Sequence, residues 1–296
     1  MKFLLTGATG FTGSHVFTQL QRDGLQVRCY VRSPEKAAAL ESAGVEVARG
    51  DLSDEAALSK ACAGCDALIN VASIGFGHGP GIIRALDRAG VKRAVFVSTT
   101  AIFTQLNAPS KSVRVAAESA IRASRLDWTI LRPTMIYGTD RDRNICRLIR
   151  YVRRSPVLPV FGSGEFLMQP IYVEDLAAGI VAAAQSSHAI SNDYNLSGAK
   201  PLSYNELAQT VAKSVGRSLR LLHIPARPAV KILKVIEKMG VRIPIKAEQV
   251  LRLNEDKAFT WDKAAEAFGF APRTFAEGVE TEIRSMGFAA RIDPVS

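Results

Sequence analysis

The chain begins MKFLLTGATGFTG (residues 1–13), with glycines at Gly7, Gly10 and Gly13. Residues 2–6 have the apolar character of a short buried strand, and residues 11–20 have the apolar spacing of a helix. The glycines therefore lie on a strand-to-helix turn. Gly7 permits the tight turn, Gly10 lets the backbone approach a pyrophosphate, and Gly13 lets helix and strand pack closely. Because helix N-termini favour negative charge, we expect a dinucleotide to bind these glycines and the residues among them: Thr9, Phe11 and Thr12.

The end of the next expected strand, residues 26–31, bears on the choice of nicotinamide cofactor. An NAD site needs an acidic side chain there for the ribose 2′-hydroxyl. This chain has Arg32 and Ser33 instead, and arginine can fork onto a 2′-phosphate. Ser33 can donate to the same phosphate and cap the helix that Pro34 begins. The alternative is that Ser33 only caps the helix and Arg32 is solvated. We predict NADP(H) in preference to NAD(H).

Two further segments are expected at the cofactor. After the third strand, Asp51 can accept a hydrogen bond from the adenine amino group, and Leu52 can cover the ring. Asp51 could equally cap the helix expected over residues 56–63, so both roles stay open. Residues 72–81 follow the fourth strand and begin with Ala72 and Ser73. That position faces the cofactor in doubly wound sheets. His78 in this glycine-rich stretch is either an acid or base near neutral pH or an exposed side chain.

Strand-like and helical segments alternate through the first half of the 296-residue chain. Strands are expected over residues 45–48, 67–71, 94–97 and 128–131, with helices over residues 56–63, 81–89 and 112–123 between them. This alternation predicts an α/β fold, a Rossmann-type doubly wound parallel sheet. No apolar run reaches 18 residues, and the opening apolar stretch is too short for a signal peptide. We expect a cytoplasmic protein, with peripheral attachment to a membrane left open.

The charge distribution and the cysteine content limit the binding partners and metals that can be expected. Of the net charge of +10, seven units lie in residues 217–252, where nine Lys and Arg face only Glu237 and Glu248. This segment could meet a phosphorylated small-molecule substrate, an acidic protein or an anionic membrane surface, or simply be a solvated basic face. Nucleic acid is not expected, because the segment lacks aromatic side chains for base stacking. Cys62 and Cys65 form a CxxC without a second ligand pair, so we expect free thiols and no metal.

Several motifs together resemble the extended and atypical short-chain dehydrogenase/reductases, the epimerase-like proteins. Besides the opening turn, they are FVSTT (residues 96–100), LRPTMIYG (131–138) and YVEDLA (172–177). The resemblance implies a dinucleotide-binding domain over residues 1–160, with the helix of residues 173–187 returning to it. It also implies a smaller, mainly helical C-terminal lobe over residues 161–296 for a substrate or partner. It assigns Pro133 and Thr134 to the cofactor and Thr100 to the substrate hydroxyl.

The resemblance fails at the catalytic dyad. Active members carry a Tyr and a Lys four residues apart on the helix after the fifth strand, and the Lys lowers the pKa of the Tyr for proton exchange. Counting back from Glu118 places Ser110 at the Tyr position and Arg114 at the Lys position. Arginine can still bind ribose hydroxyls, but a serine is too weak an acid to replace the phenol. Tyr137 and His78 remain candidate proton donors, and Lys111 is only partly on the face of Arg114.

Two functions therefore compete. The first is an NADP(H)-binding sensor or accessory protein without the usual chemistry, similar to NmrA-like redox sensors or to the complex I accessory subunit. The second is an NADP(H)-dependent oxidoreductase or nucleotide-sugar epimerase/dehydratase-like enzyme with a rewired proton donor, acting on a nucleotide sugar or another phosphorylated compound. A complete cofactor turn beside a lost dyad favours the first. The substrate-lobe pattern favours the second.

Overall fold

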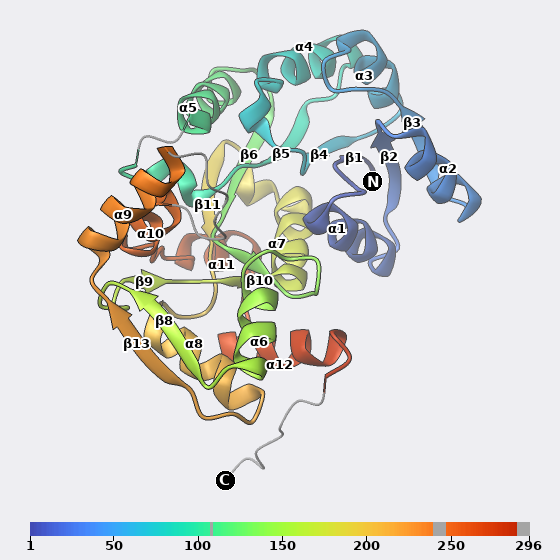
Figure 1. Ribbon diagram of the computed structural model, residues 1–296. Coiled ribbons are helices and arrows are strands. Elements are labelled where there is room, and N and C mark those ends of the chain that lie inside the picture. Colours follow the sequence, from blue (N-terminus) through green and yellow to red (C-terminus); the bar gives the residue numbers. More distant parts are fainter. Residues whose placement is uncertain (107–108, 239–246, 289–296) are drawn as a thin grey trace. The chain divides into compact units, whose positions relative to one another are not determined.

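The computed structural model describes residues 1–106, 109–238 and 247–288 (Figure 1). The chain forms two compact units and passes between them repeatedly. Unit 1 comprises Met1–Thr134, Val173–Leu196 and Thr260–Pro272, and unit 2 contains Met135–Tyr172, Ser197–Phe259 and the described residues from Arg273 onward. Residues 135–160, which the sequence assigned to the first domain, lie in unit 2, because the chain leaves the main sheet directly after Pro133.

Unit 1 is built on a seven-stranded parallel sheet in the order β11-β6-β5-β4-β1-β2-β3. The order reverses between β1 and β4. Strand β1 lies between β2 and β4, and Phe3 is opposite Val27 on β2 and Ala67 on β4. This arrangement confirms the predicted doubly wound sheet. The strands are β1 (Lys2–Thr6), β2 (Gln26–Val31), β3 (Glu46–Arg49), β4 (Ala67–Asn70), β5 (Arg93–Val97), β6 (Asp127–Pro133) and β11 (Asn192–Leu196).

Helices cover both faces of this sheet (Figure 1). On one face α1 (Phe11–Arg22) packs on α7 (Val173–Gln185), and α11 (Asp262–Phe268) also contacts α7. On the other face α4 (Gly79–Ala89) packs between α3 (Glu55–Cys62) and α5 (Pro109–Arg122). Helix α2 (Pro34–Ser42) joins β2 to β3. Short 3-10 turns, η1 (Ile74–Phe76) and η2 (Thr100–Phe103), follow β4 and β5, and η3 (Ser187–Ala189) precedes β11.

Unit 2 is mainly helical. Its core is formed by apolar side chains of α6 (Ile145–Arg154), α8 (Tyr204–Ser214) and α12 (Phe275–Ser285) around Tyr137. Three strand pairs flank them: β7 (Ile136–Tyr137) with β10 (Ile171–Tyr172), β8 (Val157–Phe161) with β13 (Arg220–Ile224), and β9 (Leu167–Met168) with β12 (Leu202–Ser203). The remaining helices are α9 (Ala226–Lys238) and α10 (Ala247–Leu253). Among the described residues, no helix combines the length and apolar character that a membrane span requires.

Candidate functional site

The glycine turn between β1 and α1 has the geometry that its sequence requires. Gly7 has a φ of 77°, and a Cβ added to it would lie 2.8 Å from the Ala72 nitrogen. A Cβ on Gly13 would lie 2.0 Å from the Gly7 carbonyl oxygen, so α1 packs directly against the turn. Gly10 is exposed and has a φ of −81°, with 3.2 Å from an added Cβ to the nearest atom. Gly7 and Gly13 thus serve the turn itself, whereas Gly10 leaves its outer side open.

A buried hydrogen-bond pair holds the ends of β1 and β4 together. The Thr6 hydroxyl donates to Asn70 Oδ1 at 2.7 Å, and Asn70 Nδ2 donates to the Ala72 carbonyl at 2.9 Å. These bonds fix the start of the loop that carries Ser73, whose hydroxyl accepts from the Gly75 nitrogen at 3.2 Å. The sequence analysis missed Thr6 and Asn70. The available signal was a polar residue at the end of each of two apolar strands.

At the end of β2, Arg32 lies in solvent. Its side chain is 83% exposed, and Nη1 is 3.5 Å from Asp51 Oδ2. Ser33 caps α2 by accepting from the Lys36 nitrogen at 3.5 Å, and Pro34 is the first helical residue. The predicted cap is therefore confirmed, while the roles of Arg32 and Ser33 toward a 2′-phosphate remain predictions.

Asp51 does not cap α3. Its Oδ1 accepts from the Ser53 nitrogen at 2.9 Å and from the Ser53 hydroxyl at 2.7 Å, and these bonds lower the pKa of Asp51. The cap of α3 is Asp54, which accepts from the Ala57 nitrogen at 2.9 Å, because the helix begins at Glu55. One of the two roles left open for Asp51 was therefore wrong. The other, toward adenine, stays a prediction, and Leu52 is partly buried against the core of unit 1.

Ser110 and Arg114 lie side by side on α5. Arg114 Nη1 donates to the Ser110 hydroxyl at 2.6 Å. The guanidinium also lies against the backbone of η1, because a Cβ added to Gly75 would be 3.0 Å from Arg114 Nε. Lys111 is directed elsewhere, and its Nζ donates to the Thr104 carbonyl at 2.6 Å. Since a guanidinium has only donors and stays protonated, it cannot act as a base toward the serine.

Thr100 and His78, two further candidates from the sequence, also lie in unit 1. Thr100 is buried, and its hydroxyl donates to the Pro133 carbonyl at 3.3 Å. The Thr134 nitrogen donates to the Leu196 carbonyl at 3.0 Å, so Thr100, Pro133 and Thr134 meet where β5 and β6 end. His78 is half-buried and immediately precedes α4, without capping it through its side chain.

Tyr137 belongs to the core of unit 2. Its side chain is 1% exposed, and its hydroxyl donates to the Phe275 carbonyl at 3.3 Å. The ring packs against Tyr172 and Phe275 with centroid distances of 5.5 and 5.3 Å. Gly278 leaves the space for the hydroxyl, since a Cβ there would lie 2.0 Å from it. These contacts favour packing as the role of Tyr137.

A buried ion network anchors α5 to the sheet. Its residues were not among the predicted site residues. Arg132 on β6 donates to both oxygens of Glu118, at 2.7–3.2 Å, and its Nη1 donates to Asp193 Oδ1 on β11 at 2.8 Å. Burial is the largest single influence and alone would raise the pKa of Glu118, but the interactions with Arg132, Ser98 and Arg122 together hold the pKa below its usual range. The helix that carries Ser110 and Arg114 is thereby fixed at its centre.

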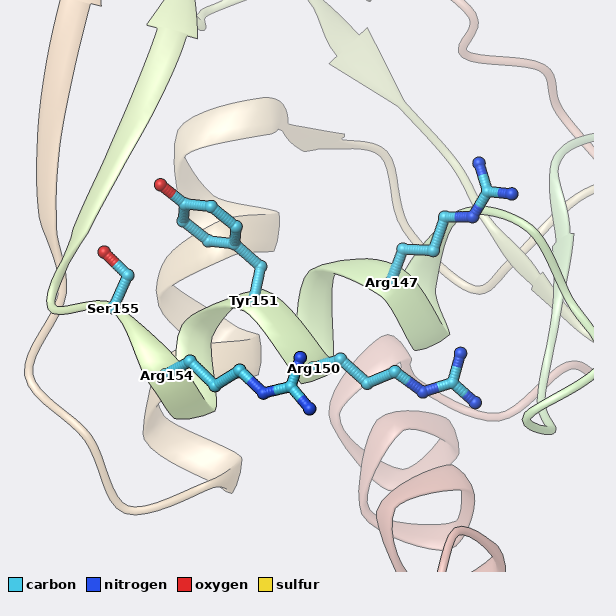
Figure 2. A pocket seen from close by; sticks show the side chains of 5 residues that line it. All are labelled: Arg147, Arg150, Tyr151, Arg154 and Ser155. Atoms are coloured by element: carbon cyan, nitrogen blue, oxygen red, sulfur yellow. The ribbon is translucent and has the colours of Figure 1, made fainter. Parts of the chain in front are cut away.

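A second basic surface lies in unit 2. Arg147, Arg150, Tyr151, Arg154 and Ser155 line a hollow of about 400 Å³ along α6 (Figure 2). No carboxylate of the described residues forms an ion pair with these three arginines. The sequence also predicts a basic surface over residues 217–252. There, Arg217, Arg220, Arg227, Lys231 and Lys234 are exposed, whereas Arg242 and Lys246 and the side chains of Lys238 and Arg252 lie outside the described residues.

Known proteins resemble this chain in sequence and in fold. A family model described as NAD(P)H-binding matches residues 7–186. The ceramide reductase of Caulobacter vibrioides is 31% identical over 234 residues, which are 75% of this chain and 73% of that protein. NADH dehydrogenase [ubiquinone] 1 alpha subcomplex subunit 9 of Arabidopsis thaliana is 27% identical over 280 residues, which are 86% of this chain and 69% of that protein. The Citrobacter sp. triphenylmethane reductase complexed with NADP(H) shares the fold, with a TM-score of 0.75 and 22% identity. The match covers 97% of this chain and 100% of that chain.

Proposed function

Because the chain belongs to the NAD(P)H-binding family of atypical short-chain dehydrogenase/reductases, we propose that it binds NADP(H) as a sensor or accessory protein without the family's proton-transfer chemistry. The observation that carries this proposal is the 2.6 Å hydrogen bond from Arg114 to the Ser110 hydroxyl. The two residues at the dyad positions satisfy each other. Neither offers an acid or base that titrates near neutral pH.

The cofactor part of the proposal depends on the carboxyl ends of the strands in unit 1. Gly10 and the first N–H groups of α1, which no side chain caps, would hold the pyrophosphate. Arg32 and Ser33 would hold the 2′-phosphate. Among the residues that the structure describes, Arg32 has only an exposed carboxylate partner at 3.5 Å, a kind of pair that contributes little. A phosphate could therefore replace Asp51 as its partner at small cost.

Arg114 would bind the cofactor as the family's Lys does, without the part of that residue's role that concerns proton transfer. Its guanidinium lies against the Gly75 backbone in the loop after β4, where a nicotinamide ribose is expected in this family. There it can donate to ribose hydroxyls and supply a fixed positive charge. It cannot lower the pKa of a neighbouring phenol, because position 110 is a serine.

A specific observation also favours the second candidate, an NADP(H)-dependent oxidoreductase. Phe76, next to Gly75 in η1, is 77% exposed, and Phe103 in η2 is 44% exposed. Two exposed aromatic rings on the loops after β4 and β5 would suit an apolar substrate. Relatives whose names are ceramide reductase and NAD(P)H azoreductase agree with a reductase. In that case Thr100 or His78 would have to supply the proton.

The partner surface remains part of the proposal. Arg217 Nη2 donates to the Arg153 carbonyl at 3.2 Å, so the basic segment expected from residue 217 onward adjoins the C-terminal turn of α6. With Arg147, Arg150 and Arg154 it would form one basic surface of unit 2 for an acidic protein or an anionic membrane surface.

The test is a pair of measurements on the purified full-length chain. NADPH binding is followed by the fluorescence of the cofactor, and hydride transfer is followed by loss of NADPH absorbance with nucleotide sugars, quinones and simple ketones. We expect saturable binding and no oxidation above the rate without protein. Steady turnover that Thr100→Val or His78→Ala reduces by about 10²-fold or more would refute the sensor and establish the oxidoreductase.

A further inference from the structure

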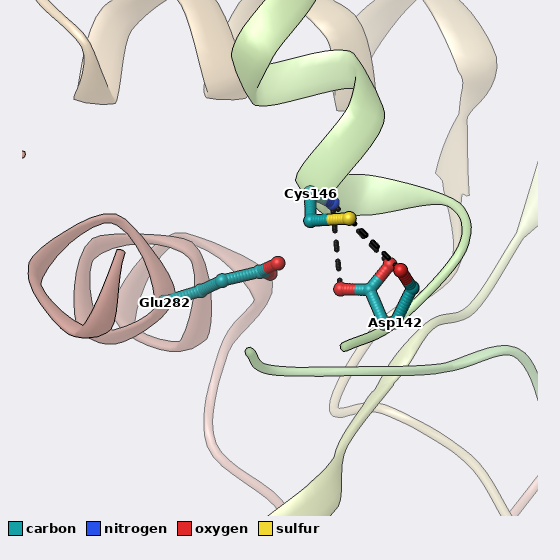
Figure 3. Close-up of side chains that lie close together, drawn as sticks. All are labelled: Asp142, Cys146 and Glu282. Carbon is teal, nitrogen blue, oxygen red and sulfur yellow. Dashed lines mark hydrogen bonds between the residues drawn. The ribbon is translucent and has the colours of Figure 1, made fainter. Parts of the chain in front are cut away.

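Three buried donor groups converge inside unit 2. Asp142 lies in the loop before α6, Cys146 in the first turn of α6, and Glu282 on α12. Figure 3 shows Glu282 extending toward Asp142 and Cys146, with the Cys146 sulfur directed to the main chain of Asp142. Their oxygen and sulfur atoms lie within 4.8 Å of one another, and all three residues are buried. Donor atoms from a loop and two helices therefore gather in one buried place.

Glu282 is the anomaly in this cluster. It is 0% exposed, and neither of its carboxyl oxygens has a hydrogen-bond partner. Buried polar side chains are nearly always hydrogen-bonded, and a buried carboxylate without a partner is strongly unfavourable. A basic group adjoins the cluster, because Arg150 Nη1 donates to Cys146 Sγ at 3.7 Å. Asp140 adds a further acidic group nearby, so acids outnumber bases around Glu282.

The other two donors are held in place by the backbone. The Asp142 carboxylate accepts from the Asn144 nitrogen at 2.7 Å and from the Cys146 nitrogen at 3.3 Å. The Cys146 thiol donates to the main-chain carbonyl of Asp142 at 2.9 Å. A thiol and a carboxylate are thus preorganised at the N-terminus of α6, and Glu282 completes the set from a helix that is remote in sequence.

We infer that Asp142, Cys146 and Glu282 form a binding site for a divalent metal ion with the ligand preferences of zinc. Zinc accepts thiolate and carboxylate ligands in one tetrahedral shell, and a water would complete it. Its bonds of about 2.0–2.3 Å require neighbouring donors about 3.3–3.8 Å apart, so the most distant pair has to close by about 1 Å. The thiol proton and any proton on Glu282 pass to solvent when the ion binds.

The charges of the three donors, the ion and Arg150 sum to zero. Two carboxylates and a thiolate carry three negative charges, which the ion and the guanidinium of Arg150 together neutralise. The competing arrangement has no metal, and a proton is shared between Glu282 and Asp142. That arrangement would leave Cys146 as a spectator, and at least one oxygen of Glu282 would still lack a partner.

The test uses the full chain purified after treatment with a chelator. Zinc is titrated by calorimetry, bound metal is counted by mass spectrometry, and cobalt is added to detect thiolate-to-cobalt charge transfer in the near ultraviolet. We expect one equivalent of zinc per chain, a thiolate band with cobalt, and a higher Tm with zinc than with chelator. Glu282→Gln, which keeps the shape of the side chain, should weaken zinc binding by at least about 100-fold. Cys146→Ala should remove the cobalt thiolate band.

The matched control is Cys65→Ala, a change at a buried cysteine of unit 1 that should leave zinc affinity and the cobalt band unchanged. Folded wild-type protein that binds neither ion would overturn the proposal. Zinc binding that is equal in wild type and Glu282→Gln would also overturn it, as would a thiolate band that survives Cys146→Ala. None of these readouts depends on the nicotinamide cofactor.

Discussion

Arg32→Ala should weaken NADPH binding about tenfold and leave NADH binding unchanged. A charge-assisted hydrogen bond to phosphate contributes about 1.5–3 kcal/mol. The lower end applies here, because the Arg32 side chain is 83% exposed and its interaction is screened by solvent. Its present pairing with Asp51 at 3.5 Å is also lost when the phosphate binds. A net effect of about 1.4 kcal/mol corresponds to a factor of ten.

The assay is a titration of both cofactors at fixed ionic strength, with wild type, Arg32→Ala and a control. Arg49→Ala is the matched control, because Arg49 ends the neighbouring strand β3 and pairs with Glu41 at 2.5 Å in solvent. The control should bind both cofactors as the wild type does. Equal loss of both cofactors in Arg32→Ala, or equal wild-type affinities for NADPH and NADH, would refute the assignment of the 2′-phosphate site.

The remaining predictions concern the turn and the buried network. Gly10→Val should abolish NADPH binding while the far-ultraviolet circular dichroism and Tm stay near wild type, since its backbone φ of −81° admits a side chain; unchanged affinity would place the dinucleotide elsewhere. Glu118→Gln should lower the free energy of unfolding by about 3–5 kcal/mol in denaturant melts, because Arg132 loses a buried partner; a change under about 1 kcal/mol would contradict this. Since pairing holds the pKa of Glu118 and Asp193 below their usual ranges, their contribution is present above pH about 4–5 and is lost as the pH falls through the folded-state pKa values; a Tm independent of pH below 5 would disprove it.

The sheet could be predicted from the sequence because its signals are local. The limits of β1 and β2 coincide with the predicted residues 2–6 and 26–31, since an apolar run bounded by Gly or polar residues encodes a buried strand without reference to the rest of the chain. The cap of α3 was assigned partly to Asp51 because the helix was expected to begin at Ala56. It begins at Glu55, and Asp54 is the cap. Boundaries are where a local pattern carries least information.

The polar contacts behind the site could not be predicted, because they join residues that are remote in sequence. Thr6 and Asn70 are 64 residues apart, and Arg132 and Asp193 are 61 apart. Each looks like an isolated polar residue in an apolar segment. The same holds for Glu282, whose neighbours Asp142 and Cys146 lie on another helix and its preceding loop. Only the folded chain shows which of these residues share a hydrogen bond or a ligand.

A sensor has to distinguish the redox states of its cofactor, and in the proposed function Arg114 would be the residue that does so. The nicotinamide ring is cationic in NADP⁺ and neutral in NADPH, so a fixed guanidinium near it opposes the oxidised form. At about 6 Å and an effective dielectric constant of about 40–80 the repulsion is about 0.7–1.4 kcal/mol, which is a factor of about 3–10 in affinity. Calorimetric titration should therefore show tighter binding of NADPH than of NADP⁺, and Arg114→Gln should remove most of that difference. Equal wild-type affinities for NADPH and NADP⁺ would refute the sensor role, because binding would not depend on the redox state of the cofactor. The accessory role would then be favoured.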